Sequence, residues 1–173
     1  AGGGWAKSIL FNDEIRKHFE AFFSNPNTLT LGVCNGCQML SILKDLIPGA
    51  SSWPIFVKNR SEQFEARFTL VKIEQSSSAF LSGMHGSFFP IAVAHGEGRA
   101  EFSSSEHFNS FINEGLTSVR YANNSGEDAT LYPSNPNGSP VGLAGMCSLD
   151  GRATIMMPHP ERVFRTCQNS WHP

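Results

Sequence analysis

The chain has 173 residues, of which 40% are hydrophobic and 16% are charged, and its formal net charge is -2. This length is sufficient for one domain with its own hydrophobic core. The weak net charge indicates neither a disordered chain nor a surface for polyanions, so no nucleic acid partner is expected. No run of residues reaches the roughly 20 apolar residues of a membrane span, so no membrane partner is expected either.

The first predicted element is a long amphipathic helix. From Trp5 to Phe23 apolar residues recur at intervals of three to four, and a polar breaker at residues 24–27 ends the pattern. The segment TLTLGV (residues 28–33) is short, apolar and β-branched, which is typical of a buried parallel strand. A second helix is predicted directly after it, over NGCQMLSILKDL (residues 35–46).

The second half of the chain is predicted to be rich in strands. Strand patterns cover FEARFTLVKIE (64–74), FPIAVAHGEG (89–98), TSVRYAN (117–123), GLAGMCSL (142–149) and RATIMMP (152–158). Asp150-Gly151 between the last two is a strong hairpin signal, and the polar residues 123–140 have the length of a functional loop. Helices on both sides of a buried strand, followed by many strands, predict an α/β fold with a mixed sheet. Sites in such folds lie at the carboxyl ends of the strands.

The motif LGVCNGCQ, at such a strand end, allows two interpretations. Read as C-x-x-C, Cys34 and Cys37 form a dithiol or half of a zinc site, which needs two further ligands. Read as G-x-C-x-G, Cys34 alone is a nucleophile on a strand-to-helix elbow. Gly32 and Gly36 would permit the tight turn, and the helix N-terminus would favour the thiolate. This second interpretation, unlike the first, explains why glycines stand at positions 32 and 36.

The other two cysteines, Cys147 and Cys167, have no spacing that suggests a second metal knuckle or a secreted disulfide framework. We therefore expect reduced thiols, a cytoplasmic location and no metal site.

A base for the thiol is predicted in the segment MMPHPERVF. Two prolines fix the backbone around His159, and Glu161 lies two residues further on, on the same side of an extended segment. A cysteine, a histidine and a carboxylate are the parts of a thiol triad, with Cys34 as nucleophile, His159 as base and Glu161 as its orienting partner. The segment PHPE alone is typical of a surface turn; its pairing with the elbow favours catalysis.

With both motifs, the chain resembles a class I, triad-type glutamine amidotransferase domain. The segments FVKNRSEQFEARF, AVAHGEGRAEF and YPSNPNGSPVGLAGMCSLDGRATIMMPHPER resemble the glutaminase end of the phosphoribosylformylglycinamidine synthase family, large single-chain enzymes of purine biosynthesis. The resemblance covers essentially the whole chain and implies a flavodoxin-like, three-layer α/β domain with a mixed, largely parallel sheet. It also implies an ATP-dependent synthetase domain as partner, with ATP and magnesium bound there and no cofactor in this domain.

The resemblance further implies that L-glutamine is the substrate. Gln38 corresponds to a glutamine-contacting position of the family, and the N–H of Asn35 would hold the oxyanion. His95 and Gly96 lie where family members close over the substrate, although a hydrogen-bonded loop at a strand end explains them equally well. Residues 132–138 would form a loop beside the substrate, although Asn-Pro and Asn-Gly are also ordinary turn formers.

Relative to that family, we expect the chain to be a partial domain, without the N-terminal strands, the Gly-rich oxyanion loop and a short C-terminal stretch. A second oxyanion donor would then be missing, unless residues 2–4 supply it. Two other functions stay open on the sequence alone. One is a thioredoxin-like oxidoreductase that uses both cysteines of the motif, and the other is a folded fragment that binds a partner without turnover.

Overall fold

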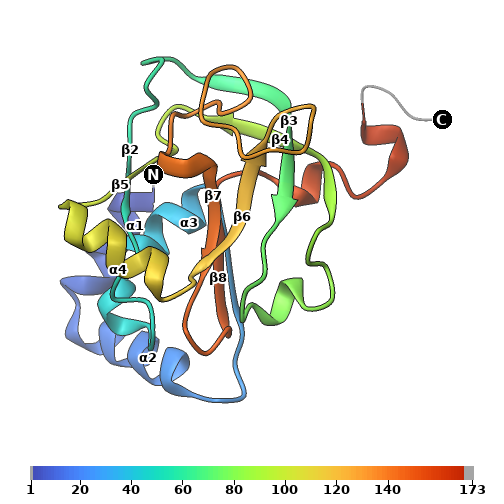
Figure 1. Cartoon of the computed structure of the whole chain (residues 1–173). Coiled ribbons are helices and arrows are strands. Elements are labelled where there is room, and N and C mark those ends of the chain that lie inside the picture. Colours follow the sequence, from blue (N-terminus) through green and yellow to red (C-terminus); the bar gives the residue numbers. More distant parts are fainter. Residues whose placement is uncertain (1, 170–173) are drawn as a thin grey trace.

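The computed structural model describes residues 2–169, in which helices pack on one face of a mixed sheet (Figure 1). The α-helices are α1 (Gly2–Leu10), α2 (Asp13–Ser24), α3 (Asn35–Ile42) and α4 (Ser105–Asn113). The strands of the sheet are β1 (Thr30–Val33), β3 (Glu65–Ile73), β4 (Phe88–His95), β6 (Thr117–Ala122), β7 (Leu143–Cys147) and β8 (Ala153–Met156). Two further strands, β2 (Ile55–Val57) and β5 (Arg99–Glu101), pair with each other. Short 3-10 turns lie at Lys44–Leu46, Ala79–Leu81, Pro140–Gly142, Pro160–Arg162 and Thr166–Gln168.

The predicted N-terminal helix is two helices in the structure. The chain turns at Asn12, whose side-chain oxygen accepts hydrogen bonds from the N–H groups of Glu14 and Ile15, both at 3.1 Å. This N-cap starts α2, and the acidic residues of its first turn complement the helix dipole. The apolar periodicity continues across the break, which explains why the sequence pattern indicates one helix. Residues 2–4, the candidate oxyanion loop, form the first turn of α1.

The predicted strands are confirmed to within a few residues, and the Asp150-Gly151 turn joins β7 to β8 with Gly151 at a φ of +73°. Three elements were not predicted: α4 and the two strands of the β2–β5 ribbon. The ribbon strands have three residues each, too few for a periodic signal. The α4 helix begins after Ser104, whose side chain caps the N–H of His107 at 3.1 Å.

The strand order in the sheet is β1-β8-β7-β6-β3-β4. The mixed sheet is confirmed, but among the described strands only β1 and β8 pair in parallel, so the parallel share is smaller than expected. Parallel neighbours require a crossover connection, whereas β7 and β8 are joined by a short hairpin and β3 to β4 by a turn segment.

Two hydrophobic cores lie on the two faces of the sheet. The first contains buried residues from every described α-helix, including Ala6, Phe23, Leu40 and Phe111. The second is formed by β3, β4, β6, β7 and β8 with turn residues such as Leu81. The described residues therefore give one helical layer on the sheet, and turns rather than α-helices cover the other face. None of the described helices is both long and apolar enough to span a bilayer.

Candidate active site

Cys34 lies on a sharp turn between β1 and α3. Its φ of 52° and ψ of -106° are unusual for a residue with a side chain, and such a conformation costs about 1–3 kcal/mol. The Cys34 N–H donates to the Met156 carbonyl at 2.9 Å, and the Cys34 carbonyl accepts from the Gln38 N–H at 3.0 Å. The backbone is therefore held at both ends of the turn, and the strained elbow presents the thiol at the N-terminus of α3.

The two glycines of the motif differ in whether the surrounding structure leaves room for a side chain. A Cβ on Gly32 would lie 2.5 Å from Leu40 Cδ1 and 3.0 Å from the carbonyl carbon and oxygen of Gly36, so β1 and α3 could not approach as closely. A Cβ on Gly36 would meet nothing within 4 Å. The elbow therefore requires glycine at position 32, before Cys34, and no contact among the described residues requires glycine at position 36.

The predicted base follows β8, the parallel neighbour of β1. The register pairs Val33 with Met156, so Cys34 and the segment leading to His159 leave the sheet at the same edge. Strand β4 lies at the other end of the strand order, yet the sheet curls so that it contacts both. The His159 N–H donates to the Ala92 carbonyl at 2.8 Å, and the Cys34 Sγ–H donates to the Ala94 carbonyl at 3.8 Å.

The His159 ring is 6% exposed, and its Nδ1 lies 2.6 Å from Glu161 Oε1. The carboxylate accepts a hydrogen bond, so in the neutral ring Nδ1 carries the proton and Nε2 is left with a free lone pair. This Nε2 atom is buried and has no hydrogen bond partner among the described residues. The thiol of Cys34 points to Ala94 rather than to the imidazole, and contacts of this kind commonly tighten only when substrate binds.

Burial raises the pKa of the Cys34 thiol above its ordinary value. A hydrogen bond from the Asn35 N–H and the charge of Arg162 act in the opposite direction, and the Glu161 carboxylate adds to the rise. The expected preference for thiolate at a helix N-terminus is thus outweighed by desolvation. The resting thiol is protonated at neutral pH and needs a base before it can act as a nucleophile.

Cys37 lies one turn into α3 and is fully buried. Burial, followed by the charge of Cys34, raises its pKa well above the ordinary value. A thiol that resists ionisation is a poor partner in dithiol exchange. No group of three or more potential metal ligands occurs within residues 2–169.

The remaining predicted residues meet at the segment 95–98, between β4 and β5. Gln38 donates from Nε2 to the Glu97 carbonyl at 2.7 Å, which ties the helix that follows Cys34 to this segment. The Gly96 carbonyl accepts from the Asn59 N–H at 2.9 Å. His95 is buried, and burial and the charge of His159 lower its pKa to about 4. The structure thus gathers these residues near the thiol, and their contact with glutamine stays a prediction.

Two asparagines of the site were not identified from the sequence. Asn59 was given no site role and Asn137 lies in a segment of ordinary turn formers, yet the two residues are 1% and 0% exposed. Both hydrogen bond to the segment 95–98. Asparagine in a polar loop is so common that only tertiary burial distinguishes these two.

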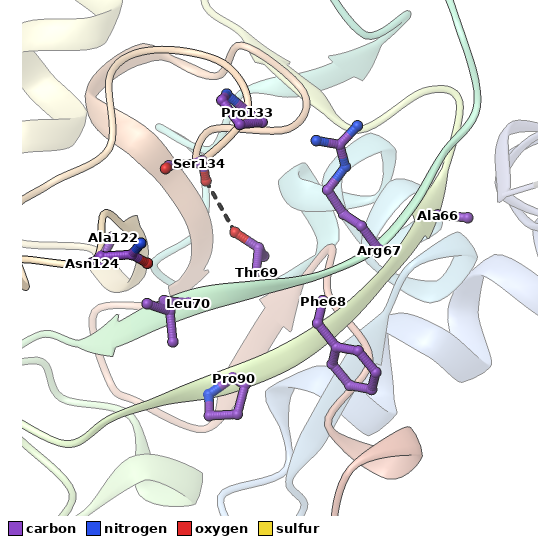
Figure 2. Close-up of a pocket in the computed structure, with 10 residues that line it drawn as sticks. All are labelled: Ala66, Arg67, Phe68, Thr69, Leu70, Pro90, Ala122, Asn124, Pro133 and Ser134. Atoms are coloured by element: carbon purple, nitrogen blue, oxygen red, sulfur yellow. Dashed lines mark hydrogen bonds between the residues drawn. The ribbon is translucent and has the colours of Figure 1, made fainter. Parts of the chain in front are cut away.

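A pocket of about 620 Å³ lies away from the thiol, between strands β3 and β4 and the chain at residues 122–134. Figure 2 shows Thr69 in this pocket, donating to the Ser134 carbonyl at 3.0 Å. Neither the thiol nor the His-Glu pair lines it. The size of a cavity therefore does not locate the candidate site, which rests on chemistry and strand geometry.

The fold and site together define an α/β domain of the glutamine amidotransferase class. The model of the CobB/CobQ-like glutamine amidotransferase domain matches residues 1–173, and the chain belongs to this family. A solved structure of PurLQS from Thermotoga maritima is similar, with a TM-score of 0.62 and 23% sequence identity over 93% of this chain. The match covers 61% of the length of that PurLQS chain. At this identity the similarity establishes the fold, and it confirms the predicted class I amidotransferase-like fold.

The raised pKa of Cys34 predicts the pH dependence of its alkylation by iodoacetamide. Because the thiolate is the reactive form, the rate should keep rising with pH beyond the pKa of an ordinary thiol, roughly 8.5. Peptide mapping after short exposures should place modification on Cys34 before Cys37 and Cys147, which are both buried. The variant Cys34→Ser provides the control. A rate for Cys34 that levels off below the ordinary pKa would show that burial does not keep this thiol protonated.

Proposed function

We propose that this domain hydrolyses L-glutamine through a covalent thioester on Cys34. The observation that carries the proposal is the elbow of Cys34 beside the His159–Glu161 pair, at the ends of two adjacent parallel strands. Membership of a glutamine amidotransferase family supports the same substrate. The two other functions are less well supported, because Cys37 is fully buried and because a strained nucleophile turn has no purpose in a passive fragment.

In the proposed reaction, His159 Nε2 takes the proton of the Cys34 thiol as the sulfur attacks the carboxamide carbon of glutamine. The Asn35 N–H stabilises the negative oxygen of the tetrahedral intermediate. The imidazolium then protonates the leaving nitrogen, and ammonia departs as the thioester forms. Water, deprotonated by His159, attacks the thioester, and glutamate leaves as the thiol regains its proton. Glu161 keeps the imidazole in the tautomer that this cycle requires.

We further propose that Gln38, His95 and Gly96 contact the bound glutamine from the segment between β4 and β5. The released ammonia would serve an ATP-dependent synthetase that makes formylglycinamidine ribonucleotide in the cytoplasm. ATP and magnesium would bind to that synthetase rather than to this domain. The sequence resemblance and the similarity of fold to PurLQS support this wider role, with the domain as one part of a larger enzyme.

A chloroketone analogue of glutamine should label the wild-type chain on Cys34. His159→Ala should slow labelling by about 10²- to 10⁴-fold, since the thiol loses its general base. Cys34→Ser should abolish labelling, whereas Cys167→Ser, at an exposed thiol outside the site, should leave it unchanged. Mass mapping identifies the modified peptide. Labelling confined to Cys37 would refute the triad and favour the dithiol.

The role in ammonia supply predicts a separation of two activities in the domain joined to its synthetase. His159→Ala should abolish glutamine-dependent formation of the amidine product, while formation with added ammonia persists. The reason is that free ammonia bypasses only the thiol chemistry. Both rates are measured as ATP-dependent product formation. Equal loss of the two activities would mean that His159 supports the fold rather than the reaction.

A further inference from the structure

Two buried asparagines clamp the segment 95–98 next to the thiol. Asn59 Nδ2 donates to the His95 carbonyl at 2.7 Å, and its Oδ1 accepts from the Gly98 N–H at 2.9 Å. Asn137 approaches from the loop that precedes β7 and donates from Nδ2 to the Gly98 carbonyl at 2.7 Å. Both ends of the segment are thus fixed by side chains that are distant in the sequence.

The orientation of the Asn137 amide is determined by the backbone around it. Its Oδ1 accepts from the Ser139 N–H at 3.0 Å, while Nδ2 donates to the Gly98 carbonyl. A backbone N–H can only donate and a backbone carbonyl can only accept. Exchanging the amide oxygen and nitrogen would therefore break both hydrogen bonds, and the NH₂ group must lie on the side of Gly98.

This orientation restricts the tautomer of His95. The Asn137 NH₂ group has two hydrogens: one is directed at the Gly98 carbonyl, and the other faces His95 Nε2 at 3.3 Å and the hydroxyl of Tyr121 at 3.2 Å. Because an amide nitrogen has no acceptor lone pair, a hydrogen bond between Asn137 and the neutral ring needs Nε2 as the acceptor and the proton on Nδ1. Gly98 packs directly against the His95 ring, since a Cβ at this position would lie only 2.2 Å from Nε2. This close packing leaves the ring little room to rotate away from Asn137.

In this tautomer the proton on His95 Nδ1 has no acceptor within residues 2–169, and water cannot replace one because His95 is only 3% exposed. An unpartnered buried donor is costly, and in a native protein it calls for an explanation. The preceding residue, Ala94, contacts the Cys34 thiol through its carbonyl, so His95 lies next to the candidate site. A bound substrate would then supply the missing acceptor. On the other side of the site His159 Nε2 is an unpartnered acceptor. A primary carboxamide, with one acceptor oxygen and one NH₂ donor, complements this pair.

We propose that Asn137 is a positioning residue, which fixes His95 as the Nδ1–H tautomer so that His95 offers a preformed hydrogen bond to an acceptor oxygen of bound glutamine. The inference rests on the proposed glutaminase function and extends it to the recognition of the carboxamide. Asn137 would thus determine which nitrogen of His95 donates, without touching the substrate itself.

The tautomer can be measured directly in the wild-type chain. Histidine labelled with ¹⁵N gives separate signals for protonated and unprotonated ring nitrogens, and the loss of signals in His95→Gln assigns those of His95. At neutral pH we expect a protonated Nδ1 and an unprotonated Nε2. Asn137→Ala should mix or reverse the two states, whereas Asn109→Ala should keep them. Asn109 serves as the control, because it is the same residue type at an exposed position of α4, outside the candidate site. A wild-type ring with its proton on Nε2 would overturn the proposal, even if the variants fail to fold.

The consequence for recognition is measured as a ratio of two labelling rates at Cys34. The first reagent is the chloroketone analogue of glutamine, and the second is methyl methanethiosulfonate, which carries no carboxamide or amino acid group. Asn137→Ala should lower this ratio, by up to about 100-fold if the donor is displaced by about 1 Å. Asn109→Ala should retain the wild-type ratio. An unchanged ratio in Asn137→Ala would refute the inference while leaving the glutaminase proposal intact. A wild-type chain that the analogue does not label would refute the glutaminase proposal, and with it the role of His95 toward glutamine.

Discussion

The candidate site depends on the parallel pairing of β1 with β8. The register sets Val33 opposite Met156, so both strands end at one edge, and the thiol and the imidazole are carried by the segments that follow. The hydrogen bond from the Cys34 N–H to the Met156 carbonyl continues this pairing into the elbow. A slip of one residue in β1 would turn the side chains of that strand to the opposite face of the sheet and break the match between the elbow and the base.

The curl of the sheet adds a third segment to these two. It brings β4, from the far end of the strand order, against both Cys34 and His159, so three regions that are distant in the sequence meet at the candidate site. This packing partly buries the thiol, and desolvation is the largest influence on its raised pKa. In the proposed reaction the thiolate forms only when the imidazole takes the proton of Cys34, which would couple reactivity to the complete arrangement of residues.

The sequence predicts those parts of the structure that carry a local signal. The strands, the elbow of Cys34 and the turn at Gly151 have such signals in apolar patterns and glycines, and the structure contains all of them. The helix break at Asn12 could not be predicted from the sequence, because the apolar periodicity continues across it. The functions of Asn59 and Asn137 could not be predicted, since in sequence a buried asparagine is the same as one in a surface turn. The share of parallel pairs is smaller than the family expectation, because four of the five strand pairs in the described sheet are antiparallel.

The central claim, that the elbow makes Cys34 a nucleophile toward glutamine, is tested most directly by trapping the covalent intermediate. The chain is mixed with L-glutamine, quenched in acid, digested and analysed by mass spectrometry. We predict a γ-glutamyl adduct on the peptide that contains Cys34, which is absent after substitution of Cys34 by serine. An adduct on another residue, or a Cys34–Cys37 disulfide as the sole covalent change, would contradict this claim.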